Sequence, residues 1–132
     1  MKYLCMVYFE ERSLDALTKS EHDALIGEAL AFDEELRQNG HLLAAQALQR
    51  VETATTVRTR GSKVMATDGP FAETKEQLGG FILIEARDLN EAIQIAARIP
   101  PGRLGCIEVR PIAELQPHSA VGLGLAAPER TR

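Results

Sequence analysis

The chain has 132 residues, the length of one domain built around one hydrophobic core. Apolar residues make up 45 % of the sequence, which excludes a disordered polymer, and the net charge of −4 argues against nucleic acid as the main partner. The apolar run before Glu10 is too short for a secretory signal or a membrane span. With only two cysteines and no such signal, we expect a cytoplasmic protein without a disulfide framework.

Strands and helices are predicted to alternate through the first part of the chain. Residues 3–9 are rich in aromatic and β-branched side chains, which favours a strand. Residues 20–39 carry apolar side chains at helical spacing behind a capping box at Ser20–Asp23, and Gly40 stands where this helix should end. Residues 42–48 are apolar but rich in alanine, and we interpret them as a further strand.

A hairpin is predicted in the middle of the chain. Residues 55–60 and 63–67 are two β-prone runs, and Gly61-Ser62 between them is typical of a two-residue turn. The remaining elements are a strand at residues 81–86, a helix that begins with a capping box at Asp88 and ends before Pro100, and a last strand at residues 106–112.

This order of elements predicts a ferredoxin-like α+β sandwich with an extra hairpin. Residues 1–115 would form the domain. Residues 116–132 are rich in Gly, Ala and Pro, and we expect a loosely ordered C-terminal tail there. Two helices can cover only one face of such a sheet, so the other face should be polar if it meets water.

That other face is predicted to be apolar. In the first strand Cys5 and Val7 point one way, whereas Leu4 and Met6 point the other. Half a dozen large apolar groups left in water would forgo on the order of 10 kcal/mol of burial free energy. The simplest cover is the same face of a second copy, so we expect an isologous homodimer with a cleft between the two sheets.

The run from Asp68 to Glu76 allows a structural interpretation. Asp68 would accept hydrogen bonds from its own loop as an Asx turn, and Gly69 would let the backbone bend. Pro70 would open a short helical turn, and Phe71 would fill the core. On this interpretation the motif is a capped turn and nothing more.

The same run also allows a functional interpretation, because a turn needs none of the charges that follow it. Asp68 and Glu73 could act as acid and base on a small carbonyl or ring substrate if one carboxyl were kept neutral by burial. The candidate ligand-binding residues are Phe71, Lys75, which could hold an anionic group, Glu76, and, near the start of the long helix, His22.

The motif also resembles a known family. Asp68-Gly69-Pro70-Phe71, the following charges and Gly79-Gly80-Phe81 look like the DGPF group of the YCII-related family, as do the MKYLCMVY start and the closing GCIEVRPI run. The resemblance implies a ferredoxin-like fold and a dimeric α/β barrel. Some family names mention transcription initiation, some relatives accompany alternative sigma factors, and a few are lyases or dehydrochlorinases of ring compounds.

One departure from the resemblance concerns catalysis. The more distant YCII branch carries a His–Asp pair that suggests an enzyme, but its histidine position falls near Ala29 here. His22 lies two turns away and does not inherit that role. The histidines and cysteines show no metal-ligand spacing, so we expect neither a structural metal nor a cofactor, and we interpret Cys5 and Cys106 as small buried hydrophobes.

The sequence therefore favours a protein that binds a small polar molecule in a cleft of a homodimer, with acid/base chemistry of the lyase or isomerase type. A rival hypothesis is a non-catalytic regulatory module that works with an alternative sigma factor. A third is a purely structural dimer whose loop is only a loop.

Overall fold

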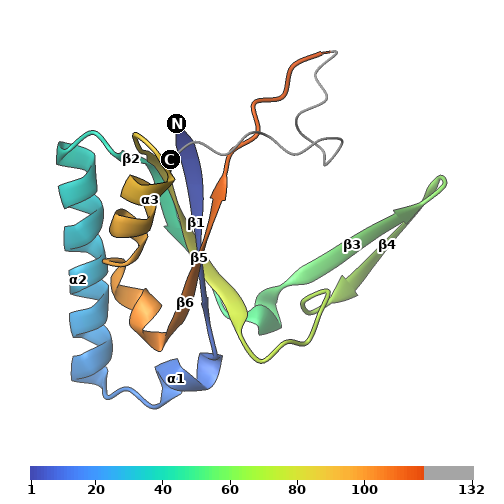
Figure 1. The fold of residues 1–132 in the computed structure, drawn as a ribbon. Coiled ribbons are helices and arrows are strands. Elements are labelled where there is room, and N and C mark those ends of the chain that lie inside the picture. The colour runs from blue at the N-terminus through green and yellow to red at the C-terminus, as the bar shows by residue number, and fades with distance from the viewer. Residues whose placement is uncertain (118–132) are drawn as a thin grey trace.

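The computed structural model describes residues 1–117, and the predicted tail lies almost wholly outside them. The elements in chain order are β1 (Lys2–Phe9), α1 (Glu11–Asp15), α2 (Lys19–Gln38), β2 (Leu42–Ala47), η1 (Val51–Thr53), β3 (Thr55–Arg60), β4 (Lys63–Asp68), β5 (Gln77–Glu85), α3 (Leu89–Ala96), η2 (Pro100–Leu104) and β6 (Gly105–Pro111) (Figure 1). None of the helices in this part of the chain combines the length and the apolarity needed to cross a bilayer.

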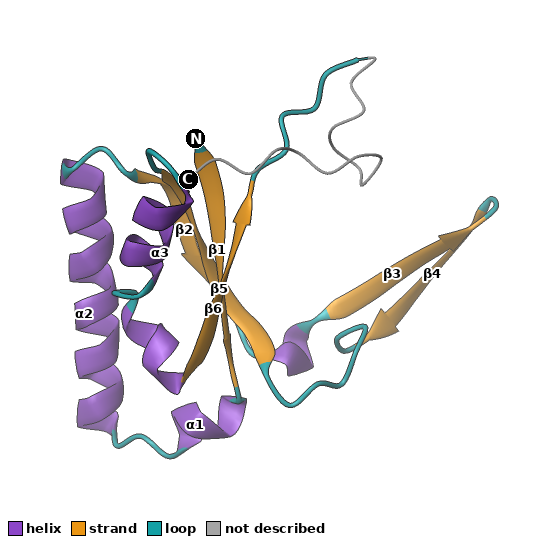
Figure 2. Ribbon diagram, viewed as in Figure 1, coloured by secondary structure: helices purple, strands orange, loops and turns teal. Residues whose placement is uncertain are grey.

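Four strands form one antiparallel sheet in the order β2-β5-β1-β6. Helices α2 and α3 lie together on one face of this sheet (Figure 2). The two edge strands are therefore β2 and β6, and the two central strands are β5 and β1. The predicted α+β class is confirmed, and the connectivity is compatible with a ferredoxin-like fold.

The hydrophobic core lies between this sheet and the two helices. Alternation along β1 turns Tyr3, Cys5, Val7 and Phe9 toward the helices, where all four are buried. The other core side chains come from α2, from β5 and the residue after it, and from α3 and the segment after it, and they are Phe32, Leu36, Ile82, Ile84, Ala86, Ala92, Ile95, Ala96 and Ile99. Each large side chain buried here stabilises the fold by about 1.5–3 kcal/mol.

The opposite face of the sheet is also apolar at its centre. Leu4 pairs across the strands with Leu83 and Met6 with Phe81, while Tyr8 pairs with Leu78. These six side chains are half-buried, and no helix or strand within residues 1–117 packs over them. We call this surface the bare face. The expectation that the central strands are apolar on both sides is confirmed.

Helix α2 begins one residue before the predicted start, with a different cap. Thr18 accepts a hydrogen bond from the Glu21 N–H at 3.1 Å, and the Glu21 carboxylate accepts one from the Thr18 N–H at 2.9 Å. The box predicted at Ser20–Asp23 was therefore wrong. A true glutamate reaches back across the first turn, whereas the shorter aspartate side chain is the weaker partner. At Asp88 the N-cap is confirmed, since Asp88 accepts from the Glu91 N–H at 2.9 Å, but the predicted box is not closed, because the Glu91 carboxylate accepts from the Arg87 N–H at 2.8 Å instead.

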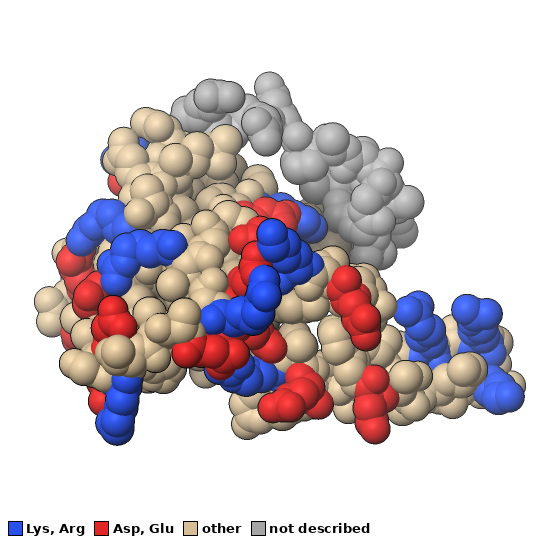
Figure 3. Space-filling view, turned by 90° about the horizontal axis from the view of Figure 1, so that it is seen from below, with Lys and Arg blue, Asp and Glu red and all other residues tan. Residues whose placement is uncertain are grey.

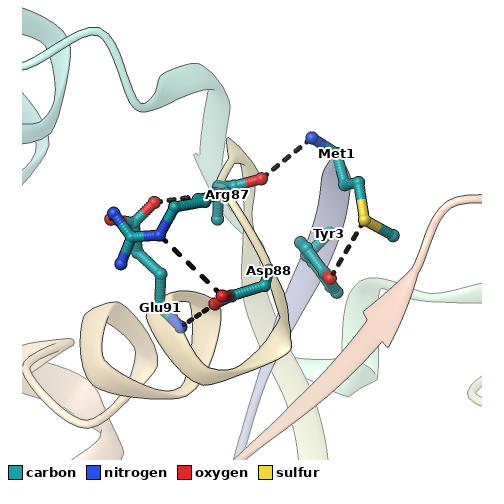
Figure 4. A network of polar contacts seen from close by, with 6 residues as sticks. Met1, Tyr3, Arg87, Asp88 and Glu91 are labelled. Atoms are coloured by element: carbon teal, nitrogen blue, oxygen red, sulfur yellow. Dashed lines mark hydrogen bonds and ion pairs between the residues drawn. The ribbon is translucent and has the colours of Figure 1, made fainter. Parts of the chain in front are cut away.

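The cap of α3 is tied to the start of β1 (Figure 4). The N-terminal ammonium donates to the Ala86 carbonyl at 2.8 Å, just before the cap. Tyr3 lies beside this junction, and its hydroxyl points at the Met1 sulfur, 3.8 Å away. Burial, and to a smaller extent the charge of Asp88, raises the pKa of Tyr3. Strand β1 and helix α3 are thus fixed to each other at one end of the sheet.

Strand β5 begins at Gln77, four residues before the predicted start, because the two glycines of the motif are part of the sheet. A Cβ at Gly80 would lie 2.8 Å from the Gln46 carbonyl oxygen of β2. A Cβ at Gly79 would meet the ring of Phe9, and the register of β1 against β5 shifts at this point. Gly79-Gly80 therefore lets β2 and a core aromatic ring approach β5 closely.

The predicted hairpin is confirmed, but it does not join the sheet. Strands β3 and β4 pair only with each other and project from the body on the side away from the helices (Figure 1). Every residue of β4 is exposed, and in β3 only Thr56 is half-buried. We call residues 55–68 the arm.

The two cysteines lie on the neighbouring strands β1 and β6, but on opposite faces of the sheet. Cys5 is buried among the core residues, and burial raises the pKa of its thiol to about 11. Cys106 pairs with Tyr8 on the bare face and is exposed, so the expectation that both cysteines are buried was wrong for Cys106. Side chains alternate between the two faces along each strand, and the register pairs Cys5 with Val109 on the core face and Cys106 with Tyr8 on the bare face.

Candidate functional site

The first residues of the motif form a turn at the root of the arm. Gly69 adopts a φ of +99°, which a glycine reaches without strain, and its N–H donates to the Ala54 carbonyl at 2.7 Å. The Thr56 hydroxyl donates to the Gly69 carbonyl at 2.8 Å. The Asp68 carboxylate makes no hydrogen bond within residues 1–117, so the expected Asx turn is not formed. Backbone pairing holds this turn instead.

The rest of the motif is a surface loop between β4 and β5. Phe71 is 81 % exposed, so the expectation that it fills the core was wrong. Because β4 leaves the body with the arm, the loop that follows β4 and carries Phe71 begins outside the core. The Lys75 ammonium lies 3.4 Å from the Glu10 carboxylate. Partial desolvation of the Glu10 carboxylate raises its pKa. Contacts with Arg12 and Lys75 outweigh this effect together and hold the pKa of Glu10 below its usual value.

A cleft of about 430 Å³ lies elsewhere, between α2 and the β2–β5 edge of the sheet, with the start of η2 at its end. This volume falls in the range of small-molecule sites. Its lining is mainly apolar and consists of Val7, Phe9, Leu14, His22, Leu25, Ile26, Ala29, Leu30, Asp33, Ala45, Gln46, Ala47, Leu48, Gly79, Gly80, Phe81, Ile82, Ile99, Pro100 and Pro101.

The cleft brings together few of the residues singled out in the sequence. Of the predicted site residues, His22 lines it, whereas the predicted catalytic pair and the other ligand candidates belong to the arm and its loop. The two glycines of the motif contribute to its floor. The motif thus shapes the cleft through Gly79 and Gly80 rather than through its charges.

Two titratable side chains line the cleft, and both come from α2. His22 and Asp33 are three helical turns apart, which places them on one face of the helix. A rise of 1.5 Å per residue separates their backbones by about 16 Å. They therefore mark opposite ends of the cleft and cannot act as a hydrogen-bonded acid–base pair.

Asp33 is the residue that the sequence interpretation missed. Its carboxyl is half-buried and forms no ion pair within residues 1–117. Burial raises the pKa of this carboxyl, and the nearby Arg37, whose guanidinium pairs with Glu34, opposes that shift only in part. The available signal was its place on the apolar stripe of the helix, four residues after Ala29 and seven after Ile26. An unpaired carboxylate in an apolar cleft is suited to bind a cation or a hydrogen-bond donor.

Comparison with known proteins places the chain among its relatives. The model of the YCII-related domain matches residues 1–116. The chain belongs to the YCII-related family. An uncharacterized protein of Rhizobium meliloti (strain 1021) is similar to this YCII-related protein, with 34 % identity over 119 residues that cover 89 % of this chain and 96 % of the relative. Ala29, where the histidine of the more distant YCII branch would fall, also lines the cleft of this family member.

Replacing Asp33 by asparagine should raise the free energy of unfolding near neutral pH, because the folded state disfavours the carboxylate. The folded pKa of Asp33 lies above the unfolded one, so this penalty is complete above the folded pKa and disappears as the pH falls below the unfolded pKa. The advantage of Asp33→Asn over wild type, measured by urea denaturation, should shrink from about pH 7 to about pH 3. Asp23→Asn, on the same helix but outside the cleft, is the control, and an advantage of Asp33→Asn that does not change with pH would contradict the assignment.

Proposed function

We propose that this protein binds a small molecule that has an apolar body and a basic amine in the cleft beside α2. The observation that carries the proposal is the half-buried Asp33 carboxyl, unpaired within residues 1–117, in a mainly apolar cleft of about 430 Å³. An ammonium placed against Asp33 would stabilise its ionised form, and the apolar walls would take up the body of the ligand.

The walls and ends of the cleft restrict the ligand further. Leu25 and Ile26 offer aliphatic surface from α2, and Pro100 with Pro101 limits the length at the start of η2. The His22 imidazole, about 16 Å along the helix from Asp33, would contact the far end of a long ligand or water at the mouth. The sequence predicted a polar ligand between two sheets, but the lining favours an amphipathic ligand on the helix side.

We also propose that the protein is a homodimer that covers the bare face. Leu4, Met6 and Tyr8 with their three partners on β5 form a continuous apolar surface at the centre of the sheet. The same face of a second copy would bury these side chains around a two-fold axis, which gives the dimeric barrel that the family resemblance implies. Covering six large side chains in each copy would bury apolar surface that the lone protomer leaves partly exposed, which favours association.

The chemistry expected from the sequence finds no support in the cleft. Asp68 and Glu73, the predicted acid and base, belong to the arm and its loop and lie outside the lining. Lyase- or isomerase-type activity therefore stays a prediction. The regulatory role with an alternative sigma factor stays one as well.

Binding can be tested with a series of primary amines, from butylamine to 2-phenylethylamine, each compared with the alcohol of the same skeleton. The amines should raise the melting temperature of the wild-type protein more than the alcohols, because only the amine can pair with Asp33. Asp33→Asn should abolish this difference, and Asp23→Asn should keep it. If no amine exceeds its alcohol, or if the difference survives in Asp33→Asn, the proposed ligand class is wrong.

The homodimer can be tested by sedimentation velocity of the full chain. The wild type should sediment as a dimer at micromolar concentration. Met6→Lys, on the bare face and outside the cleft lining, should raise the dissociation constant at least about a hundredfold, or about 2.8 kcal/mol, because it places an unpaired ammonium in an apolar contact. Ile93→Lys, at an exposed apolar position of α3 on the helix side, is the matched control and should leave the dimer intact. A wild-type monomer would refute the proposal.

A further inference from the structure

A second hollow, of about 480 Å³, lies beside β6, at the opposite edge of the sheet from the cleft. Its walls include Ile93 of α3 and the core-face side chains Ile107 and Val109 of β6. Charged side chains of both signs lie across the body where it is seen from below (Figure 3). This lining is different, because Arg103 is its one charged residue, and the Arg103 guanidinium pairs with the Glu28 carboxylate at 2.8 Å. We call this apolar surface the β6 hollow.

The β6 hollow adjoins backbone groups that have no partner strand. Within residues 1–117, β6 pairs with β1 alone. The Ile112 N–H donates to the Lys2 carbonyl at 2.9 Å. Every second residue of an antiparallel strand bonds to the same neighbour, so in this register Ile107 and Val109 direct their N–H and C=O groups to the free edge. Such an edge is a template for a further strand unless something covers it.

The chain itself carries a segment with the pattern of such a strand. Residues 120–127 follow the described part of the chain and contain no charged side chain. Val121, Leu123 and Leu125 stand at every second position, with a glycine between each pair. This alternation predicts a strand with one apolar side, and its glycines suit a place where another surface approaches closely. The match to the YCII-related domain ends at residue 116, before this segment.

The segment follows β6 at a distance along the chain that lets the two pair. Residues 112–119 lie between them, which is enough chain for a loop that turns back. A strand that returns in this way pairs antiparallel, and directly opposite residues share a face of the sheet. A register that sets Leu123 opposite Ile107 therefore turns Leu123 toward α3. Val121 then meets Val109, and the glycines turn to the bare face, where they leave room for a second copy.

We propose that residues 120–125 pair with the free edge of β6 as a fifth strand of the sheet, with Val121, Leu123 and Leu125 over the β6 hollow. Because the segment is tethered to β6, this contact is intramolecular and forms at a high effective concentration. Composition alone predicted a loosely ordered tail at residues 116–132, whereas this pairing gives residues 120–125 a defined place. The pairing depends on neither the amine ligand nor the homodimer.

The test is amide hydrogen exchange of the full chain, followed residue by residue by NMR. The amides of Ile107 and Val109 should be protected in the wild type, because carbonyl groups of the segment accept from them. Leu123→Asp with Leu125→Asp should speed their exchange at least about tenfold, because carboxylates cannot lie in the apolar hollow. The acceleration should exceed that of the Cys5 amide, which lies in the central strand β1 and reports global unfolding.

The matched control is Ala127→Asp with Thr131→Asp, which adds the same charge beyond the pairing segment and should leave the exchange rates as in the wild type. Wild-type amides of Ile107 and Val109 that exchange without protection would overturn the proposal, because the edge would then be open. Protection that survives the two substitutions at the leucines also overturns it, and protection that rises with protein concentration would identify a second copy as the cover. An equal acceleration at Cys5 would show only a loss of global stability and would overturn the pairing as well.

A urea denaturation cycle tests the β6 hollow itself. Ile93→Ala should lower the midpoint of the otherwise wild-type chain, and it should lower it by about half as much or less when Leu123 and Leu125 are already replaced by aspartate, because both changes remove the same contact. Ile26→Ala is the control, since Ile26 is similarly exposed (46 % against 49 % for Ile93) but lines the cleft. Its effect should be equal in both backgrounds. Equal effects of Ile93→Ala would place the segment away from the hollow and overturn the proposal.

Discussion

The structure depends on a sheet whose two central strands are apolar on both sides. The inward residues of β1 and β5 pack on the two helices, and this packing holds the domain together. The outward residues, Leu4 and Met6 among them, are left without a cover from residues 1–117. Apolar surface of this kind is costly for a domain of this size, because net folding stabilities are only about 5–15 kcal/mol. The need to cover this face links the fold of one chain to the assembly of two.

The cleft and the arm follow from the same architecture. Gly79 and Gly80 let β5 run close to β2 and Phe9, and both glycines line the cleft that Asp33 also lines. Keeping a half-buried carboxyl there lowers stability, and such a cost is common where a side chain is retained for binding. The motif before these glycines turns the chain back from the arm, so one short stretch forms the turn at the root of the arm and lines part of the cleft.

Much of the fold could be predicted because it follows local periodicity. The alternation in β1 and the cap at Asp88 are properties of a few neighbouring residues, so the sequence revealed both. The exposure of Phe71 could not be predicted, because nothing near it says that β4 leaves the sheet. Asp33 was missed for a similar reason, since its burial depends on β2, β5 and η2 meeting α2. His22 was placed among the ligand candidates and does line the cleft, but the predicted acid and base do not.

The cover of the bare face can be measured most directly through Cys106, which pairs with Tyr8 on that face and is exposed in the protomer. Its rate of alkylation by iodoacetamide should fall as the protein concentration rises from nanomolar to micromolar, because the second copy shields the thiol. Cys5 is the internal control, since it is buried with a pKa of about 11 and should stay unmodified throughout. A Cys106 rate that is the same at every concentration would contradict the account.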